Sequence, residues 1–307
     1  MKDFEERVTG LKEQNDIVLL VHNYQRPEVQ DVADFLGDSL DLAERASKVS
    51  QQNIVFCGVD FMAESAKILN PGKRVVHPIS PPNLVAKCPM AGMVDAEGLE
   101  SLKREHPDAV VVSYVNTTAD VKAISDVCCT SANAVNVISS LPEEKVIFVP
   151  DTNLGLYVMR FVTDKELILW PGYCRTHVWI TAEEIEKLKA RHPDAEVIVH
   201  PECTPDVIDL ADTVGSTQGM VKRVKESDGT EFIIGTEKGL VYRLKKENPD
   251  KEFYYAERAV CPNMKEITPK NVLRSMETLG PEVVLDEDII ERARIPLQRM
   301  VAIGRKE

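Results

Sequence analysis

The chain has 307 residues, 43% of them hydrophobic and 28% charged, which is a globular composition and enough for two or three domains. Its formal net charge of −13 argues against nucleic acid or an anionic membrane surface as a partner, because both attract positive surfaces. No apolar run reaches the length of a membrane span, and residues 1–6 contain no apolar stretch. We therefore expect no signal peptide, a cytoplasmic location, and cysteines that are free thiols or metal ligands rather than disulfides.

Apolar strands rich in β-branched residues recur along the chain and alternate with helical stretches. The first strand of each copy is expected at 17–21, 110–114 and 196–200. A second strand is expected at 53–58, 145–149 and 231–234. Strands that alternate with helices in this way predict small parallel sheets with helices packed on them.

Three of the seven cysteines occupy equivalent places in this pattern. Cys88, Cys174 and Cys261 follow one another at spacings of 174 − 88 = 86 and 261 − 174 = 87 residues. Seven residues after each cysteine stands a residue suited to cap a helix N-terminus. These candidates are Asp95, Thr181 and Thr268. The same local pattern three times indicates an internal repeat of roughly 85–90 residues.

The repeat predicts three homologous small α/β domains with parallel sheets, arranged around a pseudo-threefold axis. No cysteine segment precedes the copy that begins at 17–21. The chain ends with such a segment, around Cys261, which is followed by only part of a copy. We therefore expect the two ends of the chain to meet in one domain. The predicted domains are residues 1–84 together with 268–307, residues 85–171, and residues 172–267.

Polar residues follow the strands at their carboxyl ends, where open α/β sheets bind ligands. They form the triplets His22-Asn23-Tyr24, Tyr114-Val115-Asn116 and His200-Pro201-Glu202. Short polar turns into helices end in Ser39, Ser131 and Thr217, which we expect to cap those helices. Around a shared axis these groups would converge on one cavity, which offers N–H groups to carboxylates or phosphate and side chains for acid–base chemistry.

The same symmetry would bring Cys88, Cys174 and Cys261 together. Three thiolates suit either a zinc site completed by His177 or a cubane iron–sulfur cluster with one iron left open. We expect no ligand role for the remaining cysteines, which lack counterparts in all copies. These are Cys57, Cys128, Cys129 and Cys203. The residues alone leave open an iron–sulfur enzyme, a zinc hydrolase and a non-catalytic iron–sulfur sensor.

Ten motifs, in order between about residues 17 and 265, resemble the quinolinate synthase family. They are Val21-His22-Asn23-Tyr24-Gln25, Gly37-Asp38-Ser39, Phe61-Met62-Ala63-Glu64, Cys88-Pro89-Met90, Tyr114-Val115-Asn116, Cys129-Thr130-Ser131-Ala132-Asn133, His200-Pro201-Glu202-Cys203, Gly215-Ser216-Thr217, Gly235-Thr236-Glu237 and Val260-Cys261-Pro262-Asn263-Met264. One departure is Arg175-Thr176, between Cys174 and His177, where less polar residues are expected.

The resemblance implies an enzyme of NAD biosynthesis that condenses iminoaspartate (iminosuccinate) with dihydroxyacetone phosphate to give quinolinate, phosphate and water. It also implies a [4Fe–4S] cluster on Cys88, Cys174 and Cys261, whose open iron acts as a Lewis acid without net redox change. A functional partner, L-aspartate oxidase or dehydrogenase, would supply the iminoaspartate.

The resemblance further implies which side chains meet the substrates. His22 and Ser39 would bind iminoaspartate. The rest of the pocket would be Tyr114, Val115, Asn116, Ser131, His200, Pro201, Glu202 and Thr217. The candidates for proton transfer are Tyr24, Tyr114, His200 and Glu202. Glu202 is the expected base, with a pKa tuned toward neutrality.

Overall fold

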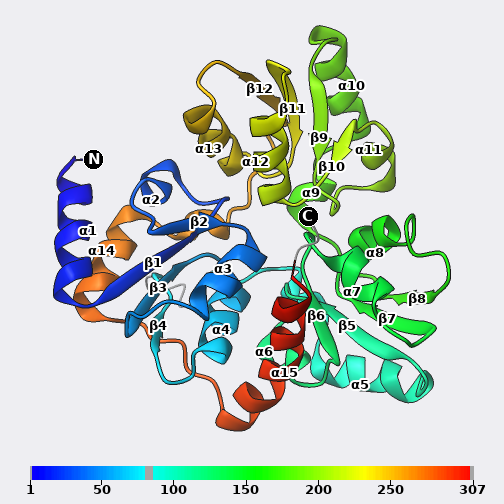
Figure 1. Cartoon of the computed structure of the whole chain (residues 1–307), viewed down its shortest axis with the longest axis horizontal. Helices are drawn as coiled ribbons and strands as arrows, with labels where there is room; N and C mark the ends of the chain where they lie inside the picture. The colour runs from blue at the N-terminus through cyan, green and yellow to red at the C-terminus, as the bar shows by residue number, and fades with distance from the viewer. Residues whose placement is uncertain (1, 80–85, 305–307) are drawn as a thin grey trace.

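The computed structural model describes residues 2–79 and 86–304. Figure 1 shows three lobes around a common centre, each with its own sheet. Every sheet has four strands, and the strands pair in parallel throughout. The prediction of an α/β fold with three similar parallel-sheet domains is confirmed.

The strand order is the same in the three sheets, with the first strand of each copy in second place. The first sheet, ordered β2-β1-β3-β4, consists of β1 (Ile17–His22), β2 (Phe35–Gly37), β3 (Asn53–Cys57) and β4 (Arg74–Val76). The second, ordered β6-β5-β7-β8, consists of β5 (Val110–Tyr114), β6 (Val127–Cys129), β7 (Lys145–Val149) and β8 (Glu166–Leu169). The third, ordered β10-β9-β11-β12, consists of β9 (Glu196–Val199), β10 (Thr213–Val214), β11 (Glu231–Gly235) and β12 (Glu252–Tyr255).

The helices recur in a matching order between these strands. The first copy has α1 (Lys2–Gln14), α2 (Pro27–Gln30), α3 (Ser39–Ala46) and α4 (Asp60–Leu69). The second has α5 (Ala96–Glu105), α6 (Ala119–Ala123), α7 (Ala134–Ser139) and α8 (Thr152–Val158). The third has α10 (Ala182–Arg191), α11 (Pro205–Asp209), α12 (Thr217–Glu226) and α13 (Gly239–Glu247), preceded by the short α9 (Arg175–Val178).

In each copy an aspartate directly precedes the short edge strand, β2, β6 or β10, and holds that strand beside the first strand of the copy. Its Oδ2 accepts a backbone N–H from that first strand, and its own N–H returns a bond to the same residue's carbonyl oxygen. The Oδ2 contacts are Asp34 to Leu19 (2.7 Å), Asp126 to Val111 (2.8 Å) and Asp212 to Val197 (2.8 Å). This repeated bond is independent support for the threefold repeat.

Alternate residues of each strand pack on opposite faces, as a pleated strand requires. In β1, Val18 and Leu20 belong to a core shared by all three lobes, whereas Ile17, Leu19 and Val21 belong to a core of the first lobe alone. The second and third sheets divide their residues in the same way. One large core therefore joins the lobes, and three smaller cores lie on the outer faces of the sheets.

The C-terminal segment forms α14 (Pro269–Thr278) and α15 (Glu287–Ile303). Helix α14 contacts α1 and β3, so the segment after Cys261 does reach the first lobe. Helix α15 contacts α4 of the first lobe and also α6 and β6 of the second, as Figure 1 shows in red. The exact domain boundaries stay a prediction, and the boundary between residues 84 and 85 lies outside the described residues.

Across residues 2–79 and 86–304, every helix is too short or too polar to cross a lipid bilayer.

Candidate active site

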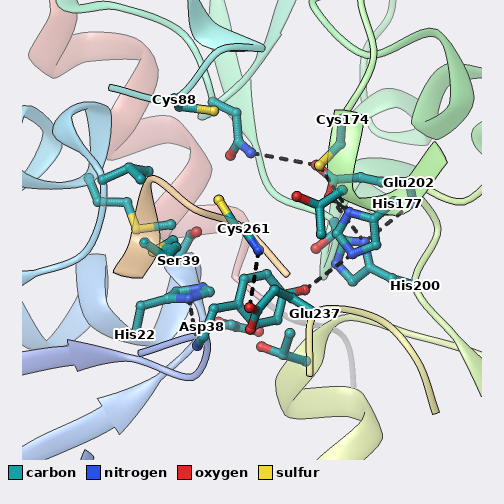
Figure 2. Close-up of a pocket in the computed structure, with 18 of the residues that line it drawn as sticks. His22, Asp38, Ser39, Cys88, Cys174, His177, His200, Glu202, Glu237 and Cys261 are labelled. Atoms are coloured by element: carbon teal, nitrogen blue, oxygen red, sulfur yellow. Dashed lines mark hydrogen bonds and ion pairs between the residues drawn. The ribbon is translucent and has the colours of Figure 1, made fainter. Parts of the chain in front are cut away.

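A cavity of about 70 Å³ lies where the three lobes meet, enough for several water molecules. Figure 2 shows that the side chains around it come from all three lobes. Its lining includes twelve predicted site residues: His22, Tyr24, Ser39, Cys88, Tyr114, Asn116, Ser131, Cys174, His200, Glu202, Thr217 and Cys261. The predicted convergence of strand-end and turn residues on one cavity is therefore present in the structure.

Two residues of the predicted pocket are not part of this lining. Val115 is buried beside α15, where it lines a small apolar cavity with Leu297 and Met300. Pro201 lies on a separate cleft nearer the surface. Both follow a strand end in the sequence, but the residues on either side of them are the ones that point toward the central cavity.

The three cysteines that line the cavity sit in loops just before helices. Asp95, Thr181 and Thr268 cap α5, α10 and α14, as predicted, and each accepts a backbone N–H through its side chain. Short helical turns that the sequence did not reveal lie between cysteine and cap: η1 (Ala91–Met93), α9 and η2 (Met264–Glu266). All seven cysteines are free thiols, and the other four are buried away from the cavity.

The Cys88, Cys174 and Cys261 side chains are partly buried around the cavity. Burial raises the pKa of the Cys88, Cys174 and Cys261 thiols, and Glu202 adds to the rise at Cys174. A buried thiolate is stable only beside a positive charge, because the interior of a protein solvates an isolated anion poorly. Three such thiols on one cavity are a donor set suited to a bound metal ion or cluster.

The prediction that Ser39, Ser131 and Thr217 cap their helices is wrong. Ser39 and Thr217 are the first residues of α3 and α12, and Ser131 lies in the turn before α7. The residues at the N-cap positions are Asp38, Asn133 and Ser216. In α3 the Asp38 carboxylate accepts two backbone N–H groups, which leaves the Ser39 hydroxyl available to the cavity.

Glu202 lies at the centre of a buried polar cluster. Its Oε2 is 2.7 Å from Nδ1 of His177 and 3.3 Å from Nδ1 of His200, and the Asn116 amide donates to Oε1 at 3.5 Å. Burial alone would raise the pKa of this carboxyl, but His177 first and then His200 lower it to about 2. The two histidines therefore lower the pKa of Glu202 rather than tune it toward neutrality. Glu202 is ionised at neutral pH.

Two tyrosine hydroxyls complete the acid–base groups. The Tyr24 hydroxyl lies 2.6 Å from Oγ1 of Thr236, and burial raises the pKa of Tyr24 and of Tyr114 well above the usual range. Burial also lowers the pKa of His22 to about 4 and that of His200 to about 3. At neutral pH the Tyr24 and Tyr114 phenols are thus protonated, the His22 and His200 rings are neutral, and Glu202 is a carboxylate.

Some residues that line the cavity are not among those that the sequence predicts for the pocket. His177, considered only as a zinc ligand, has Nδ1 3.1 Å from Sγ of Cys174, and ligand atoms of Cys174, His177 and Glu202 lie within 4.8 Å of one another. Thr176, in the dipeptide that departs from the family pattern, hydrogen-bonds to Cys261. The Cys-x-x-His spacing was the signal for His177, whereas no sequence signal marked Thr176.

The chain is similar to known proteins of one family. A family described as "Quinolinate synthetase A protein" matches residues 6–302. A quinolinate synthase of Pelobacter propionicus is 53% identical over 301 residues, covering 98% of each chain. One from Methanoregula boonei is 52% identical over 300 residues, covering 97% of this chain and 98% of that one. One from Geotalea uraniireducens is 54% identical over 298 residues, covering 97% and 96%.

Proposed function

The chain belongs to the quinolinate synthase family, enzymes that catalyse a condensation in NAD biosynthesis, and from this we propose its reaction. It condenses iminoaspartate (iminosuccinate) with dihydroxyacetone phosphate and releases quinolinate, phosphate and water. The observation that carries the proposal is the single cavity on which three cysteines and the acid–base cluster converge. The proposed location is the cytoplasm, with L-aspartate oxidase or dehydrogenase as the functional partner that supplies iminoaspartate.

Cys88, Cys174 and Cys261 are the proposed ligands of a [4Fe–4S] cluster. The fit rests on chemistry that the described residues offer: three free, partly buried thiols from three separate loops on one cavity. When bound, the cluster would supply a Lewis-acidic iron, because three cysteines leave the fourth iron without a protein thiolate.

The protein's own groups bind the two anionic substrates. His22 and Ser39 line one side of the cavity and, in the proposal, bind iminoaspartate. Asn116, Ser131 and Thr217 offer further hydrogen bonds from the second and third lobes. These uncharged donors suit carboxylate and phosphate oxygens, and the closed surroundings exclude the water that would compete for them.

Tyr24, Tyr114, His200 and Glu202 are the proposed proton-transfer groups. The two phenols are placed to donate protons to departing or developing oxyanions, and the Glu202 carboxylate is placed to accept one. His200 contributes a neutral ring whose Nδ1 accepts the Glu202 backbone N–H at 3.3 Å, which leaves the ring proton on Nε2 to be donated. Condensation, dehydration and ring closure each need such a transfer.

Iron and sulfide analysis of anaerobically purified protein, followed by a quinolinate assay with both substrates, tests the proposal. We expect Cys88→Ala, Cys174→Ala and Cys261→Ala each to abolish iron binding, and Cys203→Ala, the matched control, to retain it. Full iron content in Cys174→Ala would overturn the ligand assignment. A colourless, zinc-loaded parent protein would instead support a zinc site built on Cys174, His177 and Glu202.

A further inference from the structure

Each cysteine loop is tied to the sheet that precedes it in the chain by a backbone hydrogen bond at the same place. In every copy the carbonyl oxygen two residues before the cysteine accepts an N–H from the segment that follows the second strand, β3, β7 or β11. The bonds run from Asp60 to Ala86 (2.9 Å), from Thr152 to Gly172 (2.8 Å) and from Lys238 to Ala259 (2.8 Å). The loops are therefore anchored alike at the carboxyl ends of the three sheets.

A second tie joins an acidic side chain to the cysteine itself. Asp60 Oδ1 accepts the backbone N–H of Cys88 at 2.9 Å. Glu237 Oε1 accepts the backbone N–H of Cys261 at 3.2 Å. In each case the acid belongs to the segment that also makes the backbone bond, so one short stretch of chain holds the cysteine from two sides.

The third copy of this tie involves Asp151, which is fully buried. Its Oδ1 accepts the Leu154 N–H at 3.0 Å, and the same carboxyl is close enough to the Cys174 backbone to interact with it electrostatically. Within the described residues Oδ2 of Asp151 has no hydrogen-bond partner. A buried polar oxygen left in this state calls for a role beyond helix capping.

The three acids also share a place in the fold, at the start of the helix after the second strand. Asp60 is the first residue of α4, Asp151 is the N-cap of α8, and Glu237 accepts the N–H of Gly239, the first residue of α13, at 2.7 Å. The helix dipole favours negative charge at this end. Asp60 and Glu237 each bridge such a helix and a cysteine loop by hydrogen bonds, and Asp151 holds the equivalent position beside Cys174.

We propose that Asp60, Asp151 and Glu237 are positioning residues that hold the loops of Cys88, Cys174 and Cys261 in the conformation that binds the cluster. A rigid ligand held by three separate loops binds well only if the loops are ordered beforehand, because ordering them on binding costs affinity. The inference rests on the proposed [4Fe–4S] cluster and assigns the residues that orient its ligands.

Asp60 is the best residue for the test, because it contacts Cys88 but does not line the cavity. The variants are Asp60→Ala, which removes the acceptor, and Asp60→Asn, which keeps an acceptor oxygen of the same reach. Asp126→Ala is the matched control, since it deletes an equivalent carboxylate bond, 2.8 Å from the Val111 N–H, that involves no cysteine.

The main measurement is the rate at which a ferrous chelator removes iron from the anaerobically purified proteins. We expect Asp60→Ala to lose iron about 10-fold faster than the parent. Asp60→Asn and Asp126→Ala should stay close to the parent rate. A folded Asp60→Ala that keeps the parent rate, or an Asp60→Asn that loses iron as fast as Asp60→Ala, overturns the proposal.

Amide hydrogen exchange at Cys88, in the same proteins as isolated, separates this inference from the cluster proposal. Exchange should be faster in Asp60→Ala than in the parent, whether or not iron is bound. An iron-free parent would overturn the cluster, and unchanged exchange at Cys88 would overturn the positioning role. If Asp60→Ala does not fold, Asp151→Ala with the readouts moved to Cys174 decides the question.

Discussion

The polar cluster around Glu202 shows how neighbours decide the chemistry of a single side chain. From the sequence, a pKa near neutrality is expected for Glu202, because the proposed cluster lies beside it. The sequence could not show that the rings of His177 and His200 stack 4.6 Å apart and both face its carboxylate. These contacts connect residues from different loops, so only the folded chain reveals them.

We predict that Glu202→Gln retains the cluster but loses most of its turnover, by about 100-fold or more. The amide keeps the size of the side chain but cannot take a proton, and it cannot pair with His177. Steady-state quinolinate formation, measured beside iron content, checks this. Near-normal turnover would remove Glu202 from the proton-transfer groups.

His22 links the pocket to the pH dependence of stability. Its pKa of about 4 results first from burial, which Lys265 reinforces, while Asp38 and Glu202 act in the opposite direction. In an unfolded chain a histidine has a pKa of about 6.5. Between these two values the unfolded state binds more protons, so stability falls as the pH falls through this window.

We predict that, between pH 7 and pH 5, the unfolding free energy of the parent falls by about 2 kcal/mol more than that of His22→Gln. The glutamine does not titrate and still offers an acceptor for the Tyr24 N–H, which now bonds to His22 Nδ1 at 3.2 Å. Denaturant titrations at both pH values measure the difference. Equal pH slopes would contradict the assignment.

At the scale of elements, the sequence predicts the central strands and misses the edge strands. The predicted strands 110–114 and 145–149 match β5 and β7 residue for residue. Strands such as β2, β6 and β10 have only two or three residues, too short to show an alternating pattern. Their positions are fixed by the repeated aspartate bond, for example from Asp34 to the Leu19 N–H, which depends on chain pairing rather than local propensity.

Helix α15 is an element whose place the sequence did not give, because it packs between two lobes. Leu297 is fully buried in the shared core, whereas Ile295 on the same helix is 60% exposed. We predict that Leu297→Ala lowers the unfolding free energy by about 2–5 kcal/mol, from lost burial and the cavity left behind. Ile295→Ala is the matched control, with an expected change within about 0.5 kcal/mol. Thermal or denaturant unfolding compares them, and similar losses in both would show that α15 does not join the lobes as described.

For the whole molecule, equal spacing of cysteines and strand ends was enough to predict three domains around one cavity. Spacing could not reveal that one face of every sheet contributes to a common core, because that depends on how the lobes pack. Spacing also could not show which members of each triplet face the cavity. For this reason the predicted pocket includes Val115 and Pro201, which do not line the cavity. The length of the repeat therefore predicts the number and arrangement of domains, whereas the direction of each side chain is known only from the folded structure.

The shared core leads us to expect that the three lobes unfold together. Separate domains of this size commonly unfold in separate steps, but here each would lose one buried face if a neighbour opened. Hydrogen exchange of peptides from β1, β5 and β9 through a denaturant titration should give one common midpoint. Distinct midpoints for the three sheets would contradict the shared core as the main stabilising feature.

The repeated aspartates and the polar triplets show where symmetry was kept and where it was given up. Asp34, Asp126 and Asp212 make the same backbone hydrogen bonds, whereas the equivalent positions at the strand ends hold His22, Tyr114 and His200. Three copies of one ancestral unit can share a scaffold, but a substrate without threefold symmetry needs a different partner on each side. The three copies thus share the bonds that fix the frame and differ in the side chains that line the cavity.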